Sequence, residues 1–237
     1  MSARQARARV IDEQQANRVL LACGVIGPPL FVIVFLIEGA TRPGYSAWRH
    51  YVSQLSLGEG GWMQIANFLL CGLLSLCFAL GLRRTLQRGT GATWGPLLLA
   101  VFGLGLIVAG IFVTDPALGY PPGAPPRPPG LVTHATLHGR IHGLAGLVVF
   151  SSVAAACFVL ARRFASDPAW RGWAPYSVVT GVLVAVFFIA SLATAPLPGA
   201  PSGLLQRLAI VLGWGWIALL AVRLVWPRDG RSPRGRL

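Results

Sequence analysis

Long apolar runs alternate along the chain with short polar connections that are rich in arginine. Each run is long enough to cross a hydrocarbon core of about 30 Å, since a helix rises about 1.5 Å per residue. The pattern predicts an all-α fold, a polytopic bundle of six transmembrane helices. The expected spans cover approximately residues 19–38, 62–82, 95–114, 139–161, 174–194 and 208–226.

These spans divide the chain into three parts. Residues 19–226 form the membrane domain, residues 1–18 a basic cytoplasmic tail and residues 227–237 a second basic cytoplasmic tail. The first tail is polar, and we expect it to be disordered or to lie on the membrane surface. Within the first span, the sequence Gly27-Pro28-Pro29 predicts a kink, because proline cannot donate the helical hydrogen bond.

The composition supports a membrane protein and argues against a nucleic-acid partner. Hydrophobic residues make up 54% of the chain and charged residues only 11%, compared with about 25% in soluble domains. The net charge is +13, but most of the twenty basic residues, all arginine, cluster at the ends of apolar runs. That distribution is typical of topology signals rather than of a phosphate-binding face. The expected partner is the lipid bilayer, and the oligomeric state is unknown.

The arginines also predict which side each connection faces. Fifteen of the twenty lie before the first span, after the second, after the fourth or at the C-terminal end of the chain. Because basic residues are enriched in cytoplasmic loops, this asymmetry places both termini in the cytoplasm and the protein in the cell membrane. The five arginines expected on the outer side are Arg42, Arg49, Arg127, Arg140 and Arg207.

The first outer connection, residues 40–61, has a helical spacing of large side chains. Tyr45, Trp48, Val52 and Leu55 recur at intervals of three and four residues. This spacing predicts a short amphipathic helix that lies in the outer interface. We expect the connection to cover part of the outer face as a lid, together with the proline-rich segment 115–137.

Polar and titratable residues collect at the outer ends of the predicted spans. His134, His138 and His142 recur every four residues and therefore share one face of a helix. Charged groups at membrane depth are costly and usually face the bundle interior. The sequence thus predicts a polar outer pocket with Asp115, His138 and His142 as its floor. The candidate site residues are Asp115, His138, His142, His134, Gln206, Arg207, Ser53, Gln54, Ser56, His50 and Glu38.

Three hypotheses account for this collection of polar residues. Asp115, His138 and His142 have the chemistry of ligands for zinc or iron, which would make the protein a metal-dependent membrane hydrolase. Alternatively, the cluster binds the headgroup of an amphiphile, with Arg140 and Arg207 meeting phosphate or carboxylate. In the third hypothesis, the histidines and arginines near the interface pair with Asp115 and Glu38, and these pairs only fix the outer loops in place. Cofactors and catalytic residues stay unassigned.

Familiar catalytic motifs are absent: the chain has no HExxH, Walker loop, GxSxG or dinucleotide fingerprint. Other motifs, taken together, resemble the prokaryotic six-span family catalogued as domain of unknown function 998. The matching positions are Ser53–Gly58, Gly61-Trp62, Gln64, Asn67-Phe68, Gly110–Phe112, Thr114–Pro116, Gly119–Gly123, Leu137–Gly139, His142 and Leu205–Arg207.

The resemblance covers essentially the whole chain and implies the six-span topology, but it implies little chemistry because the family has no established activity. A more remote similarity to eukaryotic six-span proteins implicated in lipid organisation favours lipid contact by analogy. The leading hypothesis is therefore a membrane protein that binds a lipid or other amphiphile in a polar pocket of the outer leaflet. The alternative is the metal-dependent hydrolase, and the third is a small-molecule transporter.

Overall fold

The computed structural model describes residues 3–126 and 135–226, and its regular elements are helices. Six of these helices are long and apolar enough to cross a membrane, as the sequence predicted. They are α1 (Ala3–Thr41), α2 (Gly61–Thr85), α3 (Trp94–Ile111), α4 (Leu137–Ala165), α5 (Trp173–Thr194) and α6 (Ser202–Val225). Two short 3₁₀ helices, η1 (Val52–Ser56) and η2 (Pro168–Trp170), lie in the connections.

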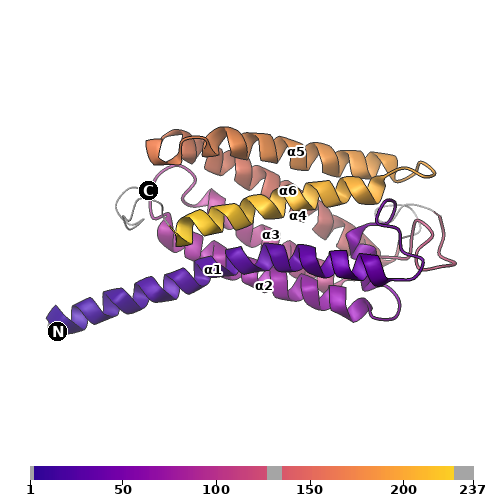
Figure 1. The fold of residues 1–237 in the computed structure, drawn as a ribbon, viewed down its shortest axis with the longest axis horizontal. Coiled ribbons are helices and arrows are strands. Elements are labelled where there is room, and N and C mark those ends of the chain that lie inside the picture. The colour runs from indigo at the N-terminus through magenta and orange to yellow at the C-terminus, as the bar shows by residue number, and fades with distance from the viewer. Residues whose placement is uncertain (1–2, 127–134, 227–237) are drawn as a thin grey trace.

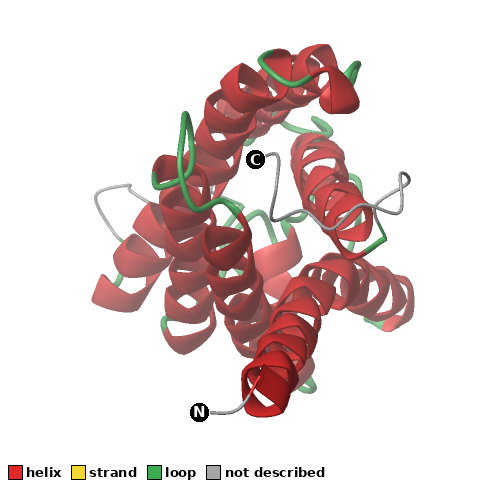
Figure 2. Cartoon of the chain, turned by 90° about the vertical axis from the view of Figure 1, so that its left-hand side faces the viewer, coloured by secondary structure: helices red, strands yellow, loops and turns green. Residues whose placement is uncertain are grey.

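The six helices form a closed ring in chain order. Each packs against the next along the chain, and α1 packs against α6 (Figure 1). Turned by 90°, the same helices are seen closer to end-on (Figure 2). The start of α1 and the end of α6 lie at one end of the bundle, which we call the proximal end (Figure 1). The opposite end, where η1 lies, is the distal end.

Several boundaries differ from the sequence prediction, and three of them affect the distal end or the N-terminal tail. α1 begins at Ala3, so the expected tail is continuous with the first span, and the helix runs through Pro28 and Pro29 without a break. α3 ends at Ile111, three residues early, which leaves Asp115 in the following loop. α6 begins at Ser202, six residues early, because the polar residues that interrupt its apolar run are buried against a loop.

Glycines permit the closest helix contacts. A Cβ added at Gly103 of α3 would lie 2.9 Å from the carbonyl oxygen of Gly72 on α2, and one at Gly105 would lie 2.7 Å from a methyl group of Val149 on α4. Small residues in such positions let backbones approach, which membrane helices use for van der Waals packing. Asn67 adds a polar link, since its Nδ2 donates to the carbonyl oxygen of Phe31 on α1 at 3.1 Å.

Aromatic side chains fill the centre of the ring. The indole of Trp214 lies 4.7 Å from the ring of Phe102, 5.6 Å from Phe31 and 5.9 Å from Phe150, measured between centroids. All four side chains are buried. Other tryptophans are exposed near helix ends, as expected for residues at a membrane–water interface. These are Trp48 and Trp62 at the distal end and Trp94 and Trp226 at the proximal end.

Candidate functional site

The connection between α1 and α2 folds inward and closes the distal end of the ring. All residues from His50 to Ser56 are buried, including both faces of η1. The predicted amphipathic helix over residues 45–55 is therefore wrong: the segment forms turns followed by η1. Its polar side chains are buried because loops and helix ends, rather than water, supply their partners. We call residues 42–60 and 112–126 together the distal cap.

Gln54 holds the two parts of the distal cap together. Its Oε1 accepts a hydrogen bond from the backbone N–H of Tyr51 at 2.9 Å, and its Nε2 donates to the carbonyl oxygen of Ala117 at 2.5 Å. Ser56 donates to the carbonyl oxygen of Ser53 at 2.6 Å. The sequence placed Gln54 and Ser56 in a ligand site, but in the structure both side chains are hydrogen-bonded within the distal cap.

Arg207 fixes the distal cap to α6. Its guanidinium is buried, and Nη1 donates to the carbonyl oxygens of Ala47, His50 and Gly203 at 2.8–2.9 Å. Nη2 donates to the hydroxyl group of Tyr45. No carboxylate lies within 4.0 Å of it among the described residues, where the one ion pair is Glu38–Arg42 at 2.9 Å. The arginine that was expected to meet a ligand anion is therefore committed to backbone carbonyls.

Burial determines the protonation of the distal-cap residues near Arg207. Burial raises the pKa of Tyr45 to about 12 although the guanidinium of Arg207 opposes this, so the phenol keeps its proton at neutral pH. The backbone N–H of Ser46 donates to Nδ1 of His50 at 2.9 Å. Nε2 of His50 lies 3.2 Å from the carbonyl oxygen of Leu118. These contacts define a neutral imidazole protonated at Nε2. Burial, with the charges of Arg49 and Arg207, lowers the pKa of His50.

Asp115 caps the N-terminus of α4. Its Oδ2 accepts from the backbone N–H of Thr136 at 2.9 Å and its Oδ1 accepts from the hydroxyl group of Thr136 at 2.6 Å. Thr136 in turn accepts from the N–H of Gly139 at 3.1 Å. A carboxylate is favourable there because the N-terminus of a helix carries partial positive charge. A Cβ at residue 139 would overlap the Asp115 carboxylate, so a larger residue there displaces this side chain.

His142 is buried one turn further into α4. Its Nδ1 lies 3.0 Å from the carbonyl oxygen of Ala109 and 2.8 Å from that of Phe112, at the end of α3. Because carbonyl oxygens only accept, Nδ1 carries the hydrogen and Nε2 carries the lone pair. His138 instead places its ring 5.4 Å from the ring of Phe112, measured between centroids.

The predicted floor of the pocket is thus divided among separate contacts. Asp115 contacts Thr136, His138 contacts Phe112 and His142 contacts carbonyl oxygens, while His134 lies outside the described residues. Across residues 3–126 and 135–226, no group of three or more His, Cys, Asp or Glu side chains is arranged to hold a metal ion. The metal hypothesis stays a prediction.

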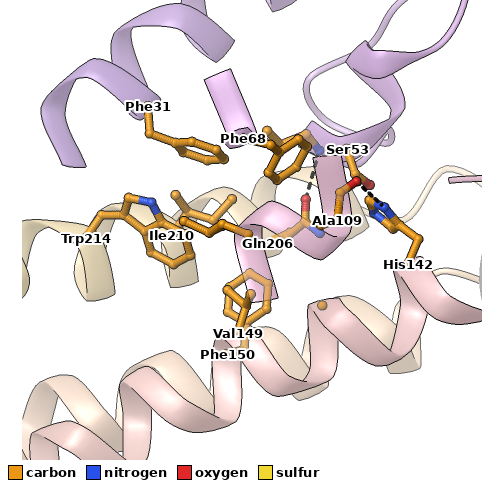
Figure 3. Close-up of a pocket in the computed structure, with 13 residues that line it drawn as sticks. Phe31, Ser53, Phe68, Ala109, His142, Val149, Phe150, Gln206, Ile210 and Trp214 are labelled. Carbon is orange, nitrogen blue, oxygen red and sulfur yellow. Dashed lines mark hydrogen bonds between the residues drawn. The ribbon is translucent and has the colours of Figure 1, made fainter. Parts of the chain in front are cut away.

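A cavity of about 50 Å³ lies directly beneath η1 (Figure 3). Most of its wall is apolar, formed by side chains from α1, α2, α3, α4 and α6. Ser53, Gln206 and His142 are its polar lining residues, and Figure 3 shows them together at one end. A buried water needs about 10–15 Å³, so the space suits a few waters or a small chemical group. The larger apolar lining residues include Phe31, Phe68, Phe150, Ile210 and Trp214.

Each of these three polar residues has unused hydrogen-bonding capacity. Gln206 accepts from the backbone N–H of Val52 through Oε1 at 2.8 Å, which leaves its Nε2 without a partner among the described residues. Nε2 of His142 and the hydroxyl group of Ser53 also make no hydrogen bond within the part of the chain that the structure describes. In the same wall, the indole N–H of Trp214 is buried without a partner.

Sequence reasoning found some of these residues and missed others. It identified Ser53, Gln206 and His142 from their polarity near span ends, and the structure brings them to one cavity. It missed Trp214 and Gly146, which lie deeper in apolar runs, where nothing in a hydrophobic pattern distinguishes a cavity wall from ordinary packing. His50, Gln54 and Ser56, which the sequence placed in the pocket, instead belong to the distal cap, and Glu38 and Arg207 hold the cap to α1 and α6.

Comparison with known proteins gives one match. A family model described as "Protein of unknown function (DUF998)" matches residues 25–223. No match was found among curated proteins or among solved structures. The matched range contains the six spans from the middle of α1 almost to the end of α6, together with the distal cap and the cavity.

Proposed function

Because the chain belongs to the DUF998 family, whose description assigns no activity, we propose its function from the cavity: it binds a lipid or other amphiphile in the distal half of the bundle. The observation that carries this proposal is the cavity beneath η1, which has an apolar wall and three partly uncommitted polar residues at one end. An apolar cavity with a few convergent polar groups is the usual form of a small-molecule site.

The three polar residues differ in what they offer a ligand. Nε2 of His142 accepts a hydrogen bond, Nε2 of Gln206 donates one and the hydroxyl group of Ser53 does either. Together they suit a hydroxyl or amide group, which both donates and accepts hydrogen bonds and carries no charge. The small volume restricts the ligand to a short amphiphile or to one end of a longer lipid.

Unsatisfied buried groups support an occupant. A buried donor or acceptor without a partner costs about 1–3 kcal/mol. The Trp214 indole N–H is such a group, and it belongs to a residue that lines the cavity. A polar group or a water molecule that accepts a hydrogen bond from the indole N–H relieves this cost. Neither the hydrolase nor the transporter hypothesis has a comparable observation in its favour.

We also propose that the proximal end faces the cytoplasm and that the protein resides in the cell membrane. In sequence order, fifteen of the twenty arginines flank the proximal ends of the helices. The enrichment of arginine in cytoplasmic loops supports this orientation. The cavity then lies in the outer half of the membrane.

The test of amphiphile binding uses a variant that fills the cavity. Gly146 lines it, and a Cβ added there meets no atom within 4 Å, so Gly146→Val places a side chain into the space without a backbone clash. Gly215→Val is the matched control, since its added Cβ is also unobstructed but residue 215 does not line the cavity. Ser53→Ala removes a polar group that makes no side-chain hydrogen bond with the described residues.

Mass spectrometry of lipids that co-purify with the full chain in a neutral detergent measures the outcome. We expect one amphiphile to be enriched over the bulk membrane extract. Its amount should fall about tenfold in Gly146→Val, which corresponds to about 1.4 kcal/mol, and should be unchanged in Gly215→Val. A lipid profile that is identical in the wild type and all three variants would exclude this cavity as a binding site.

A further inference from the structure

A second pocket lies at the proximal end, between the α2–α3 connection and the turn that contains η2. Its volume is about 490 Å³, roughly ten times that of the distal cavity. The side chains of Arg88 and Thr90 line one side, and those of Arg163, Ser166 and Asp167 line the other. Neither the sequence analysis nor the family match assigns a role to these residues.

Arg163 is the central side chain of this proximal pocket. It lies in the last turn of α4, is only 5% exposed, and donates from Nη1 to the carbonyl oxygens of Arg88 and Thr90 at 3.0 and 2.9 Å. Its Nε is buried without a partner, and Nη2 makes no hydrogen bond with any described residue. No carboxylate lies within 4.0 Å of it in residues 3–126 and 135–226.

The unused part of Arg163 has a specific shape. Nε and Nη2 form one edge of the guanidinium, and their two N–H groups point in parallel. Of the two, Nε is buried and Nη2 is not, so an anion in the pocket accepts a charge-assisted hydrogen bond from Nη2. Because Nη1 is tied to two carbonyl oxygens, the guanidinium is already held in place before an anion arrives.

The other lining residues add to this preference for anions. The Arg88 side chain is exposed and makes no hydrogen bond with another described residue, so it is free to turn toward the pocket. Thr90 supplies a hydroxyl group, whereas that of Ser166 already donates to the carbonyl oxygen of Arg163 at 2.7 Å. Asp167 is the one acidic lining residue, and its Oδ1 accepts from the backbone N–H of Ala169 at 2.9 Å. The side chains therefore carry a formal charge of +1, from two arginines and one aspartate.

We propose that the proximal pocket binds a phosphate group, with Nη2 of Arg163 as a fixed donor and Arg88 and Thr90 as further ligands. The group belongs either to the headgroup of an anionic phospholipid or to free phosphate. Trp94, four residues after Thr90 in the chain, is exposed, and tryptophan marks the headgroup level of a bilayer, so both sources reach this end of the bundle.

The test uses three substitutions that leave the hydrogen bonds of Arg163 in place. Arg88→Gln removes one charge from the pocket. Asp167→Asn removes the opposing charge but keeps an oxygen that accepts from Ala169. Arg162→Gln is the matched control, because Arg162 is an exposed neighbour of Arg163 that does not line the pocket.

Thermal unfolding of the full chain in a neutral detergent is measured against inorganic phosphate, with chloride at equal ionic strength as the reference. We expect phosphate to stabilise the wild type. The apparent Kd should rise about three- to tenfold in Arg88→Gln, fall about two- to fivefold in Asp167→Asn and stay unchanged in Arg162→Gln. The opposite signs distinguish an anion site from a structural role, since loss of structure weakens binding in both variants.

A parallel experiment identifies the source of the phosphate group. The same four proteins are unfolded in nanodiscs of phosphatidylcholine with and without phosphatidylglycerol. Stabilisation by phosphatidylglycerol that Arg88→Gln loses and Arg162→Gln keeps supports the phospholipid headgroup, whereas the same pattern with inorganic phosphate alone supports a soluble anion. If neither ligand stabilises the wild type, or if Asp167→Asn fails to strengthen binding, the proposal is wrong.

Discussion

At the scale of single residues, the distal cap places buried charge against backbone carbonyls instead of against opposite charges. Arg207 donates to three carbonyl oxygens and to a phenol, and its guanidinium lies over the rings of Phe35 and Tyr45, 5.7 and 5.4 Å from their centroids. Such an arrangement disperses the charge over several dipoles and aromatic faces. The planar fork of arginine makes this possible, and the ammonium of lysine does not reproduce it.

We therefore expect Arg207→Lys to destabilise the protein by about 2–3 kcal/mol, since hydrogen bonds from charged groups contribute about 1.5–3 kcal/mol each and lysine retains only part of the set. The free energy of unfolding in mixed micelles measures the change. Arg140→Lys is the control, because Arg140 is exposed on α4 and makes no hydrogen bond through its side chain among the described residues. Equal effects at both positions would show that the contacts of Arg207 do not stabilise the distal cap.

His50 makes the distal cap sensitive to acid. Burial lowers its pKa in the folded protein below the ordinary value of about 6.5. Between the folded pKa and 6.5, the unfolded chain binds a proton that the folded chain does not, so stability falls as pH decreases through about 6.5 and levels off below the folded pKa. Protonation would also remove the acceptor that Nδ1 offers to Ser46.

The expected result is a melting temperature that decreases between pH 7 and pH 5 in the wild type. In His50→Asn, whose side-chain oxygen still accepts a hydrogen bond and does not titrate, the decrease should be smaller. Hydrogen exchange of the backbone in residues 45–57 should rise over the same pH range in the wild type alone. A pH dependence that is the same in both proteins would assign the effect to other groups.

At the scale of elements, α4 contacts both the distal cap and the cavity, and it has a glycine at each contact: Gly139 beside the cap and Gly146 beside the cavity. Gly139 lies against the Asp115 carboxylate, where a Cβ has no room, whereas a Cβ at Gly146 meets nothing within 4 Å. The two residues lie about two helical turns apart on the same helix. They therefore form an internal comparison between a glycine at a close contact and one that borders open space.

Gly139→Ala should destabilise the protein by about 1–3 kcal/mol, because the added methyl group forces Asp115 and Thr136 away from the start of α4. Gly146→Ala should instead stabilise it by about 0.5–1 kcal/mol, because alanine loses less backbone entropy than glycine in a helix. Unfolding of the two variants under identical conditions measures the difference. If Gly139→Ala stabilises the protein as much as Gly146→Ala does, the contact between Asp115 and residue 139 is not tight.

At the scale of the whole molecule, an even number of spans brings both ends of the described chain to the proximal end (Figure 1). Two features there differ from the distal end: arginines are abundant, and one of them, Arg163, lines a large cationic pocket. The distal end carries a folded cap over a small, mainly apolar cavity. The two ends of the bundle thus present different chemistry to the two sides of the membrane.

This asymmetry predicts the orientation of the protein in cells. Cysteines added at the exposed positions 59 and 171 place a thiol at the distal and proximal ends, respectively, and the wild type gives the background from the four native cysteines. A membrane-impermeant maleimide added to intact cells should label Glu59→Cys and leave Arg171→Cys unlabelled until the cells are lysed. Labelling of Arg171→Cys in intact cells would reverse the orientation, and with it the assignment of the distal cavity to the outer half of the membrane.

The sequence by itself determined the class of the fold and the number of spans. Hydrophobic length decides both, because a segment of about twenty apolar residues has few stable alternatives to a transmembrane helix. It also pointed to Ser53, Gln206 and His142, since polar residues near span ends are conspicuous in an apolar chain. The end of α3 and the start of α6 were wrong by three and six residues, where loop contacts rather than hydropathy set the boundary.

The tertiary structure alone decided which polar residues share a site. In the sequence, Arg207, His50 and Gln54 have the chemistry of a ligand-binding cluster, but their partners are backbone groups. Arg207 donates to carbonyl oxygens of a loop about 160 residues away in the chain, and His50 and Gln54 contact the carbonyl oxygens of Leu118 and Ala117. Likewise, Arg163 looks like one more topology signal until its free edge is seen beside a pocket. The physical reason is that hydropathy records the cost of burying each residue, whereas the partner that offsets this cost lies elsewhere in the chain.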